Sequence, residues 1–265
     1  MRSVFGLRTS HLCNRVCGEK ESAMSVALIT GANKGIGLET AKQLAEAGVT
    51  VLLGARDLAK GEAAAAPLKA AGLNVHAVKI DIDDAADHAA IAAYIEKEFG
   101  VLDILINNAG VMLDNFPAPN QTSTTSRDVL QKTLDTNLLA PVALTQTLLP
   151  LIRKSAAGRI VNLSSILGSL TLHATKGSPI YDAKTFAYDT SKAALNSFTI
   201  HLAHELAGTS IKVNSAHPGW VKTDMGTDAA PMEIPDGAKT SVWLATLPED
   251  GPSGGFFHMK DALPW

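Results

Sequence analysis

Short apolar runs alternate along the chain with longer segments whose apolar side chains recur at helical spacing. The short runs are typical of buried strands and occupy residues 26–30, 49–53, 75–80, 102–106, 160–163, 211–215 and 256–257. The segments between them predict helices over residues 36–47, 58–71, 85–99, 128–152 and 186–206. This alternation indicates an α/β fold: a single-domain, Rossmann-type, doubly wound parallel sheet of about seven strands with helices on both faces.

The bulk composition fits a single globular domain. The chain has 265 residues, of which 46% are hydrophobic and 18% are charged, and its formal net charge is -3. This balance gives no reason to expect a nucleic-acid partner, and no apolar run approaches the roughly 18 residues that a membrane span needs. We therefore expect one domain over residues 24–265, located in the cytoplasm, with neither nucleic acid nor a membrane as its partner.

The first 23 residues differ from the rest of the chain. They contain three arginines and no acidic residue before Glu19, and they lack an apolar stretch long enough for a secretory signal. We interpret residues 1–23 as a poorly ordered N-terminal extension, with an organelle-targeting peptide as the alternative. Cys13 and Cys17, the only cysteines, lie here, so the domain has no thiol for a disulfide, and no metal site is expected.

A glycine-rich turn separates the first predicted strand from the first predicted helix. It reads Thr-Gly-Ala-Asn-Lys-Gly-Ile-Gly over residues 30–37. Glycines here permit a tight turn and let the backbone approach a pyrophosphate, whose charge is favoured at a helix N-terminus. The alternative is a turn with a structural role only. The residues that we expect to contact a dinucleotide are Gly31, Asn33, Lys34, Gly35, Ile36 and Gly37.

The spacing Gly-x-x-x-Gly-x-Gly is similar to that of the short-chain dehydrogenase/reductase family, and the resemblance extends from residue 26 almost to the end of the chain. It rests on several motifs that follow one another in order. They are Asn-Asn-Ala-Gly at 107–110, Ser-Ser at 164–165, Tyr-x-x-x-Lys at 188–192 and Pro-Gly-Trp-Val-Lys-Thr at 218–223. The resemblance implies a nicotinamide dinucleotide as cofactor and a small carbonyl or alcohol compound as substrate.

Two cations indicate which dinucleotide is bound. An NAD site uses an acidic residue after the second strand to accept a hydrogen bond from the ribose 2′-hydroxyl. Here Arg56 is the first charged residue after that strand, and Lys34 in the glycine turn can reach the same corner. Two cations suit a 2′-phosphate, so we expect NADP(H). Asp57 is the counter-argument, because it can serve as the ribose carboxylate from one position further on.

The family resemblance also assigns residues around the rest of the cofactor. It implies that Asp81 lies beside the adenine, that Asn108 contacts the adenosine side, and that Gly110 permits a close approach of the backbone. The loop after the sixth strand is expected to flank the nicotinamide. Its assigned residues are Pro218, Val221 and Thr223.

Tyr188 and Lys192 are four residues apart, hence on one face of a helix. A tyrosine with an ordinary pKa near 10 is a poor acid–base catalyst at neutral pH, and a nearby ammonium group is expected to lower that pKa. Tyr188 can then protonate a carbonyl oxygen, and Lys192 can also hold the nicotinamide ribose. Tyr181 lies near by, but Thr185 stands four residues after it, so we choose Tyr188.

The remaining catalytic assignments come from the resemblance. It implies that Ser165 polarises the substrate carbonyl and stabilises the developing negative charge, with Ser164 as the alternative. It also implies that Asn137 supports a proton-relay water near Lys192. Without the resemblance, Asn137 is an asparagine that caps or bends a helix.

Ser165 and Tyr188 are 23 positions apart, which is more than in the short members of the family. The additional segment, around residues 170–185, resembles in reduced form an insertion of the carbonyl reductase branch, where it can cover the helix face used for tetramer packing. Monomer and homo-oligomer therefore both remain open. The loop over residues 218–236 contains Met225, Met232, Ile234 and Pro235, and it predicts a substrate lid over an apolar pocket.

The function expected from these residues is NADPH-dependent reduction of a ketone or aldehyde. The first alternative is reduction of a 3-oxoacyl thioester, which favours basic residues at the entrance for an acidic carrier, and residues 225–236 contain none. The second is a regulator that binds NADPH without turnover, against which the intact catalytic positions argue. Sugar-nucleotide epimerisation is disfavoured because too little chain remains for a C-terminal substrate domain.

Overall fold

The computed structural model describes residues 25–115 and 121–265, so the expectations for residues 1–23, with Cys13 and Cys17, lie outside the described residues. Eight strands form one sheet in the order β3-β2-β1-β4-β5-β6-β7-β8. The strands are β1 Val26–Ile29, β2 Thr50–Ala55, β3 Val75–Lys79, β4 Ile104–Asn107, β5 Arg159–Leu163, β6 Lys212–His217, β7 Phe256–His258 and β8 Asp261–Ala262. The seven predicted parallel strands are confirmed, and β8 adds an antiparallel edge.

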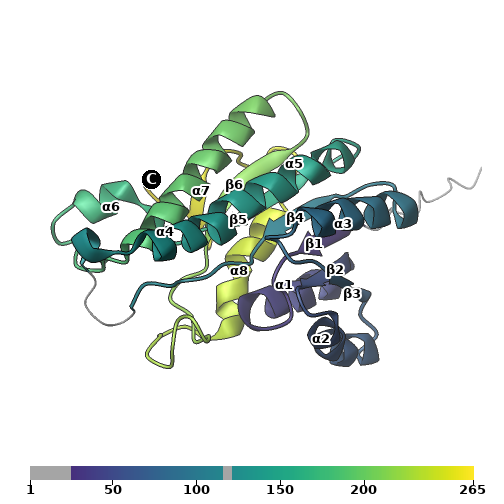
Figure 1. Cartoon of the computed structure of the whole chain (residues 1–265). Helices are drawn as coiled ribbons and strands as arrows, with labels where there is room; N and C mark the ends of the chain where they lie inside the picture. The colour runs from purple at the N-terminus through teal and green to yellow at the C-terminus, as the bar shows by residue number, and fades with distance from the viewer. Residues whose placement is uncertain (1–24, 116–120) are drawn as a thin grey trace, which may run out of the picture.

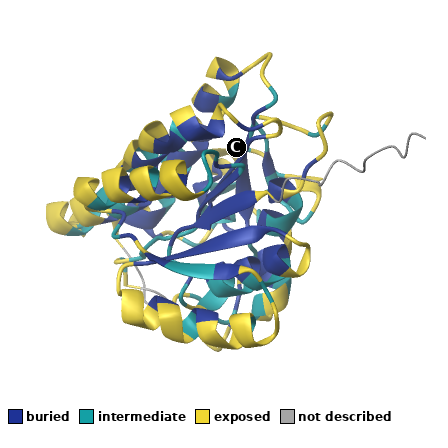
Figure 2. Cartoon of the chain, turned by 90° about the vertical axis from the view of Figure 1, so that its right-hand side faces the viewer, coloured by how far each residue is buried: buried dark blue, intermediate teal, exposed yellow. Residues whose placement is uncertain are grey.

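Helices cover both faces of this sheet (Figure 1). The main helices are α1 Gly35–Glu46, α2 Leu58–Ala70, α3 Ala85–Glu98, α4 Arg127–Leu134, α5 Ala140–Ile152, α7 Phe186–Glu205 and α8 Ile234–Ala245. One apolar core joins the sheet to α3, α5 and α7, and a second joins it to α1, α2 and α8. The sheet is buried between these layers, whereas the outer helix faces are exposed (Figure 2). The doubly wound fold predicted from the sequence is therefore confirmed.

The long helix predicted over residues 128–152 is interrupted in the structure. Helix α4 ends at Leu134, a π-helical turn follows over Asp135–Leu139, and α5 begins at Ala140. A π-helical turn contains one residue more than an α-helical turn, and such turns occur frequently at functional sites. The extra residue here brings Asn137 into the interior, where it is 1% exposed.

Two further elements were not predicted. Helix α8 begins at Ile234, inside the segment that the sequence assigned to a loop. The additional segment between Ser165 and Tyr188 contains the short helix α6, Leu170–Ala174. No helix in the described part of the chain is long and apolar enough to cross a membrane.

A chain of buried polar side chains fastens α7 to the sheet. The Asn107 amide donates to Asn162 Oδ1 at 2.8 Å, and the Asn162 amide donates to Thr199 Oγ1 at 2.8 Å. Thr199 lies on α7, and its hydroxyl is 2.8 Å from the Ser215 hydroxyl on β6. Buried polar groups with satisfied hydrogen bonds fix relative position more strictly than apolar contacts do. The helix that carries Tyr188 and Lys192 therefore has a fixed register against β4, β5 and β6.

The guanidinium of Arg159 is buried at the amino end of β5. It donates hydrogen bonds to four backbone carbonyls, those of Gly158, Ser210, Leu247 and Pro248. We expect Arg159→Met to lower the free energy of unfolding by about 2–4 kcal/mol, because it leaves several buried carbonyls without a donor. The matched control is the exposed Arg153, which pairs with Glu205 at 3.2 Å, and we expect Arg153→Met to change stability by less than about 0.5 kcal/mol.

Urea unfolding followed by circular dichroism measures both variants. A loss for Arg159→Met as small as that for Arg153→Met would contradict the structural role assigned to the buried guanidinium.

Candidate active site

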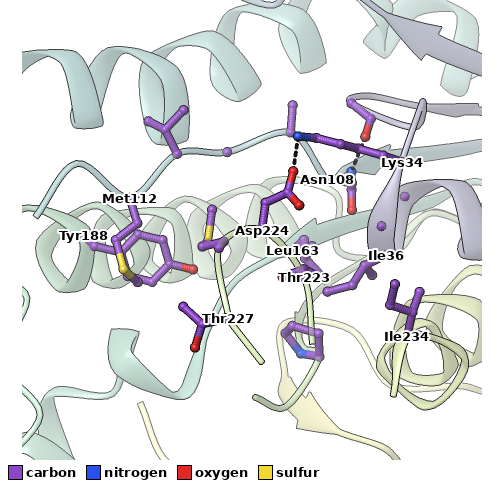
Figure 3. Close-up of a pocket in the computed structure, with 18 of the residues that line it drawn as sticks. Lys34, Ile36, Asn108, Met112, Leu163, Tyr188, Thr223, Asp224, Thr227 and Ile234 are labelled. Carbon is purple, nitrogen blue, oxygen red and sulfur yellow. Dashed lines mark hydrogen bonds and ion pairs between the residues drawn. The ribbon is translucent and has the colours of Figure 1, made fainter. Parts of the chain in front are cut away.

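A large cleft opens at the carboxyl ends of the parallel strands. Its volume is about 1050 Å³, and the glycine turn forms one wall (Figure 3). Ligands of doubly wound folds bind at this edge of the sheet. The sequence-predicted residues that line the cleft are Gly31, Asn33, Lys34, Gly35, Ile36, Gly37, Asn108, Gly110, Tyr188, Lys192, Pro218 and Thr223.

The glycine turn is packed so tightly that two of its positions exclude a side chain. A Cβ atom on Gly37 would lie 2.5 Å from Asn108 Nδ2 and 2.7 Å from the Gly31 carbonyl oxygen. Gly31 has φ +62°, and a Cβ there would lie 3.0 Å from Ala109. Asn108 Nδ2 donates to the carbonyls of Thr30 at 2.7 Å and Gly31 at 3.1 Å, which fastens the turn to the end of β4 (Figure 3). These contacts leave a backbone-lined cradle into which a pyrophosphate fits.

Lys34 reaches across the mouth of the cleft to the loop after β6. Its ammonium group donates to Asp224 Oδ2 at 2.5 Å, and both side chains are largely exposed (Figure 3). This contact lowers the pKa of the Asp224 carboxyl. Arg56 and Asp81, the other predicted contacts on the adenosine side, follow β2 and β3 and do not line the cleft. The structure therefore brings Lys34 into the cleft wall, and Arg56 and Asp81 are not among the residues that line the cleft.

A second cavity of about 370 Å³ adjoins the cleft. Tyr188 lines both cavities, and Ser165 lines the smaller one. Most of the wall of the smaller cavity is apolar and comes from three segments. These segments contribute Ile166 and Leu167, then Pro179, Ile180 and Ala183, and finally Trp220, Val221 and Met225. The additional segment before Tyr188 thus supplies one wall, a contribution that the sequence did not indicate.

The sequence predicted that the loop over residues 218–236 covers an apolar pocket. Only some of the lid residues named from the sequence line a cavity. Met225 lines both cavities, and Ile234 lines the large cleft. Met232 instead packs against Gly219 and pairs its backbone with Trp220 and Lys222, while Pro235 opens α8. Val221 lines the smaller cavity rather than the cleft.

Tyr188 is buried at the start of α7, with its hydroxyl pointing toward the centre of the site (Figure 3). Burial raises the pKa of Tyr188 to about 12, and a hydrogen bond with the Ser165 side chain acts in the opposite direction. The expectation that Lys192 brings this pKa below its ordinary value is wrong, since the pKa is raised. The desolvation of the phenolate outweighs the other influences, because the residue is only 7% exposed.

Lys192 lies one turn after Tyr188 on the same helix face. Its ammonium nitrogen is 5.5 Å from the centre of the Tyr188 ring and donates to the Leu163 carbonyl at 2.7 Å. Burial lowers the pKa of Lys192 to about 8, because the ammonium group loses its hydration. The charged form of Lys192 therefore gains from an additional hydrogen-bond acceptor in the cleft.

Asn137 holds the segment that follows β4. Its side-chain oxygen accepts from the Val111 backbone at 2.8 Å, and its amide donates to the Val111 carbonyl at 2.8 Å. The same amide donates to Ser191 Oγ at 3.0 Å. A Cβ on Gly110 would lie 3.2 Å from Asn137 Oδ1 and 3.5 Å from Lys192 Nζ, which places the three residues together at the floor of the cleft.

Asp114 is a site residue that the sequence analysis missed. It lines the cleft, and its carboxylate accepts hydrogen bonds from the backbone amides of Ala187 at 3.1 Å and Tyr188 at 3.0 Å. An acidic group that binds free amides at a helix N-terminus stabilises the helix and sets where it begins. Asp114 thereby positions Tyr188. In the sequence, Asp114 stands out only as a polar residue after a strand. Its position does not reveal that it binds the backbone of a helix 73 positions later.

Comparison with known proteins agrees with this arrangement. The sequence model of the short chain dehydrogenase family matches residues 25–234. The chain therefore belongs to the short-chain dehydrogenase family of oxidoreductases. Its relatives and structural neighbours place it in the branch of that family that includes the carbonyl reductases.

Relatives from animals and plants match nearly the whole chain. Carbonyl reductase [NADPH] 1 of Sus scrofa is 34% identical, over 91% of this chain and 94% of the relative. (-)-Isopiperitenone reductase of Mentha piperita is 34% identical, over 89% of this chain and 97% of the relative. Among solved structures, carbonyl reductase Sniffer of D. melanogaster superimposes with a TM-score of 0.79 at 32% identity, covering 91% of this chain and 100% of that one.

Proposed function

We propose that this protein is an NADPH-dependent reductase that converts a ketone or an aldehyde to an alcohol, with Tyr188 as the general acid. The observation that carries the proposal is the place of Tyr188 in the wall between the large cleft and the small apolar cavity. A proton donor at this junction serves a cofactor on one side and a substrate on the other. Relatives that carry the name carbonyl reductase [NADPH] support the same reaction.

The residues of the cleft fit a dinucleotide. The cradle at Gly31 and Gly37 accommodates the pyrophosphate at the N-terminus of α1, and Lys34 is free to turn toward a 2′-phosphate when Asp224 releases it. Lys192 faces the cleft floor, where it would hold the ribose hydroxyls. The segment with Pro218 and Thr223 would flank the nicotinamide. When bound, the nicotinamide supplies the hydride that the reduction requires.

The chain's own residues then handle the carbonyl oxygen. The Ser165 side chain interacts with the Tyr188 hydroxyl, and both would turn their hydroxyls to the substrate oxygen as negative charge develops there. Tyr188 donates the proton. Lys192 stabilises the phenolate that remains, and Asn137 keeps the floor of the cleft in place through Val111 and Ser191.

The smaller cavity argues against 3-oxoacyl thioesters as the substrate. None of the described residues that line it has a charged side chain, so these residues offer nothing to an acidic carrier arm. At the rim, Lys222 is already paired with Glu233. An uncharged, largely apolar carbonyl compound is the better match.

The test of the proposal is the fall in NADPH absorbance when purified protein is mixed with a panel of ketones and aldehydes, with NADH in parallel. Oxidation of NADPH that depends on the carbonyl compound is the expected result. Tight NADPH binding without any turnover would favour the alternative of a non-catalytic regulator. A preference for NADH would overturn the role given to Lys34 and Arg56.

Asp224 is expected to weaken NADPH binding by competing for Lys34. Asp224→Asn removes the competing charge, so the dissociation constant of NADPH should fall about two- to threefold, the scale of an exposed ion pair. That of NADH should stay the same, because it has no 2′-phosphate. Fluorescence titration of both cofactors measures the effect, with Asp228→Asn as the control on the same loop. An equal change for both cofactors would contradict competition for Lys34.

A further inference from the structure

His217 is a buried histidine at the end of β6 for which the proposed reaction has no use. It is 8% exposed, and its Nδ1 atom lies 3.1 Å from the backbone nitrogen of Ile166 and 3.4 Å from that of Gly219. Backbone N–H groups can only donate, so Nδ1 is the acceptor and carries no proton. The neutral ring therefore bears its hydrogen on Nε2, and the tautomer is fixed by the fold.

The surroundings of His217 keep the ring neutral. Burial lowers its pKa to about 3, and the neighbouring His258, whose ring centre is 4.9 Å away, acts in the same direction. A charged imidazolium would also have to place a proton on Nδ1, where two N–H groups already point. His217 is consequently a hydrogen-bond donor through Nε2 at any pH at which the enzyme would work.

The Nε2 donor is directed to the smaller cavity. Within residues 25–115 and 121–265, Nε2 has no hydrogen-bond acceptor, yet it does not belong to the fully enclosed unpartnered polar atoms, which are Asn107 Oδ1, Asn196 Oδ1 and Ser241 Oγ. His217 lines the cavity of about 370 Å³, so the cavity is where Nε2 is reached. A neutral donor held in an apolar cavity favours a ligand that supplies an acceptor.

Among the described residues, the other polar side chains of this cavity already have partners. Tyr188 and Ser165 hydrogen-bond to each other and are assigned to the reacting carbonyl. The Thr223 hydroxyl donates to the Val221 carbonyl at 3.3 Å, and the Trp220 indole donates to the Gly226 carbonyl at 2.8 Å. Of the side-chain donors that the described residues place in the wall, that of His217 thus remains for a second polar atom of the substrate.

We propose that His217 binds a second oxygen of the substrate, so that the preferred substrates are apolar ketones that carry another hydrogen-bond acceptor, such as a diketone or an alkoxyketone. The inference rests on the proposed reductase function and deepens it. The reacting carbonyl contacts Tyr188 and Ser165, while the second oxygen accepts from His217 Nε2. Apolar walls from Ile166, Leu167 and Ile180 enclose the carbon frame between the two.

Two substitutions separate the donor from the structural role of the ring. His217→Asn keeps an acceptor at the δ position for the Ile166 amide and removes the donor at the ε position. His217→Gln does the reverse, because its amide nitrogen stands where Nε2 stood. The probes are cyclohexanone, which has one acceptor, and cyclohexane-1,4-dione and 2-methoxycyclohexanone, which have two. The readout is the change in the ratio of kcat/KM between the probes, which cancels their intrinsic reactivities.

We expect His217→Asn to lower kcat/KM for cyclohexanone less than for the two-acceptor ketones. For at least one of them the loss should be about tenfold greater, the effect of one lost hydrogen bond, and it should arise mainly from a higher KM. His217→Gln should keep the wild-type ratio within about twofold while melting at a lower temperature, because Ile166 loses its acceptor. If both variants lowered kcat/KM by the same factor for all probes, His217 would have a structural role only. If the wild-type enzyme reduced no ketone, the proposed function itself would fail, and this assignment with it.

Discussion

Replacing Tyr188 by phenylalanine should lower kcat for carbonyl reduction by about 10²–10⁴-fold, the usual contribution of a general acid. The ring keeps its packing, because the side chain is 7% exposed and only the hydroxyl is lost. Binding of NADPH should therefore persist, and the melting temperature should stay within a few degrees. Stopped-flow absorbance with one ketone measures the rate, and fluorescence titration measures the binding.

Tyr181→Phe is the matched control for this substitution. Tyr181 lies seven positions earlier, its ring contacts Lys184, and it lines neither cavity, so the same loss of a hydroxyl should leave the rate unchanged. Because burial raises the pKa of Tyr188 to about 12, the group is a protonated phenol at neutral pH. A variant Tyr188→Phe that retained more than about a tenth of the wild-type kcat would exclude Tyr188 as the principal acid.

Replacing Gly37 by alanine should weaken NADPH binding about 100-fold and lower the free energy of unfolding by about 2–4 kcal/mol. The added carbon cannot be accommodated by a flexible side chain, because one of its neighbours is the Gly31 carbonyl at 2.7 Å. The other is Asn108 Nδ2 at 2.5 Å, whose displacement breaks the hydrogen bonds to Thr30 and Gly31. The cradle would open and lose the fit to a pyrophosphate.

Gly72→Ala measures the ordinary cost of adding a methyl group to a glycine. Gly72 has φ +81° and open space around it, so it should lose about 1–2 kcal/mol through backbone strain and bind NADPH normally. Isothermal titration and urea unfolding on both variants make the comparison. Equal NADPH affinities for Gly37→Ala and Gly72→Ala would show that the close packing of the turn is irrelevant to the cofactor.

The features that the sequence predicted well are those set by local pattern. Buried parallel strands are continuous apolar runs, so β1 and β4 are evident without any tertiary information. The glycine turn is equally evident, because the backbone there excludes side chains whatever lies further along the chain. Most of the predicted contacts gather at one edge of the sheet for the same reason, since each follows the carboxyl end of a strand.

The features that the sequence did not predict depend on contacts between distant segments. The pKa of Tyr188 follows from how completely the fold encloses the ring, which no Tyr-x-x-x-Lys spacing reveals. Asp114 acts on a helix 73 positions later. The first turn of α8 contains Pro235 and Gly237, two residues that suggest a loop when read alone. The π-helical turn escapes detection because one extra residue scarcely alters an apolar periodicity.

The π-helical turn at Asp135–Leu139 depends more strictly on the number of residues in it than on which side chains they carry. Deleting one residue there would convert the turn to regular α-helix. The orientation of α4 relative to α5 would hardly change, because the turn holds one residue more than an α-helical turn, but the local backbone that places Asn137 would be lost. Helix α4 would still pack on α7, whereas Asn137 would lose its contacts with Val111 and Ser191. Point substitutions on the exposed side of α4 disturb none of this. Descendants of this gene should therefore diverge there by substitution, while insertions and deletions accumulate in the loops.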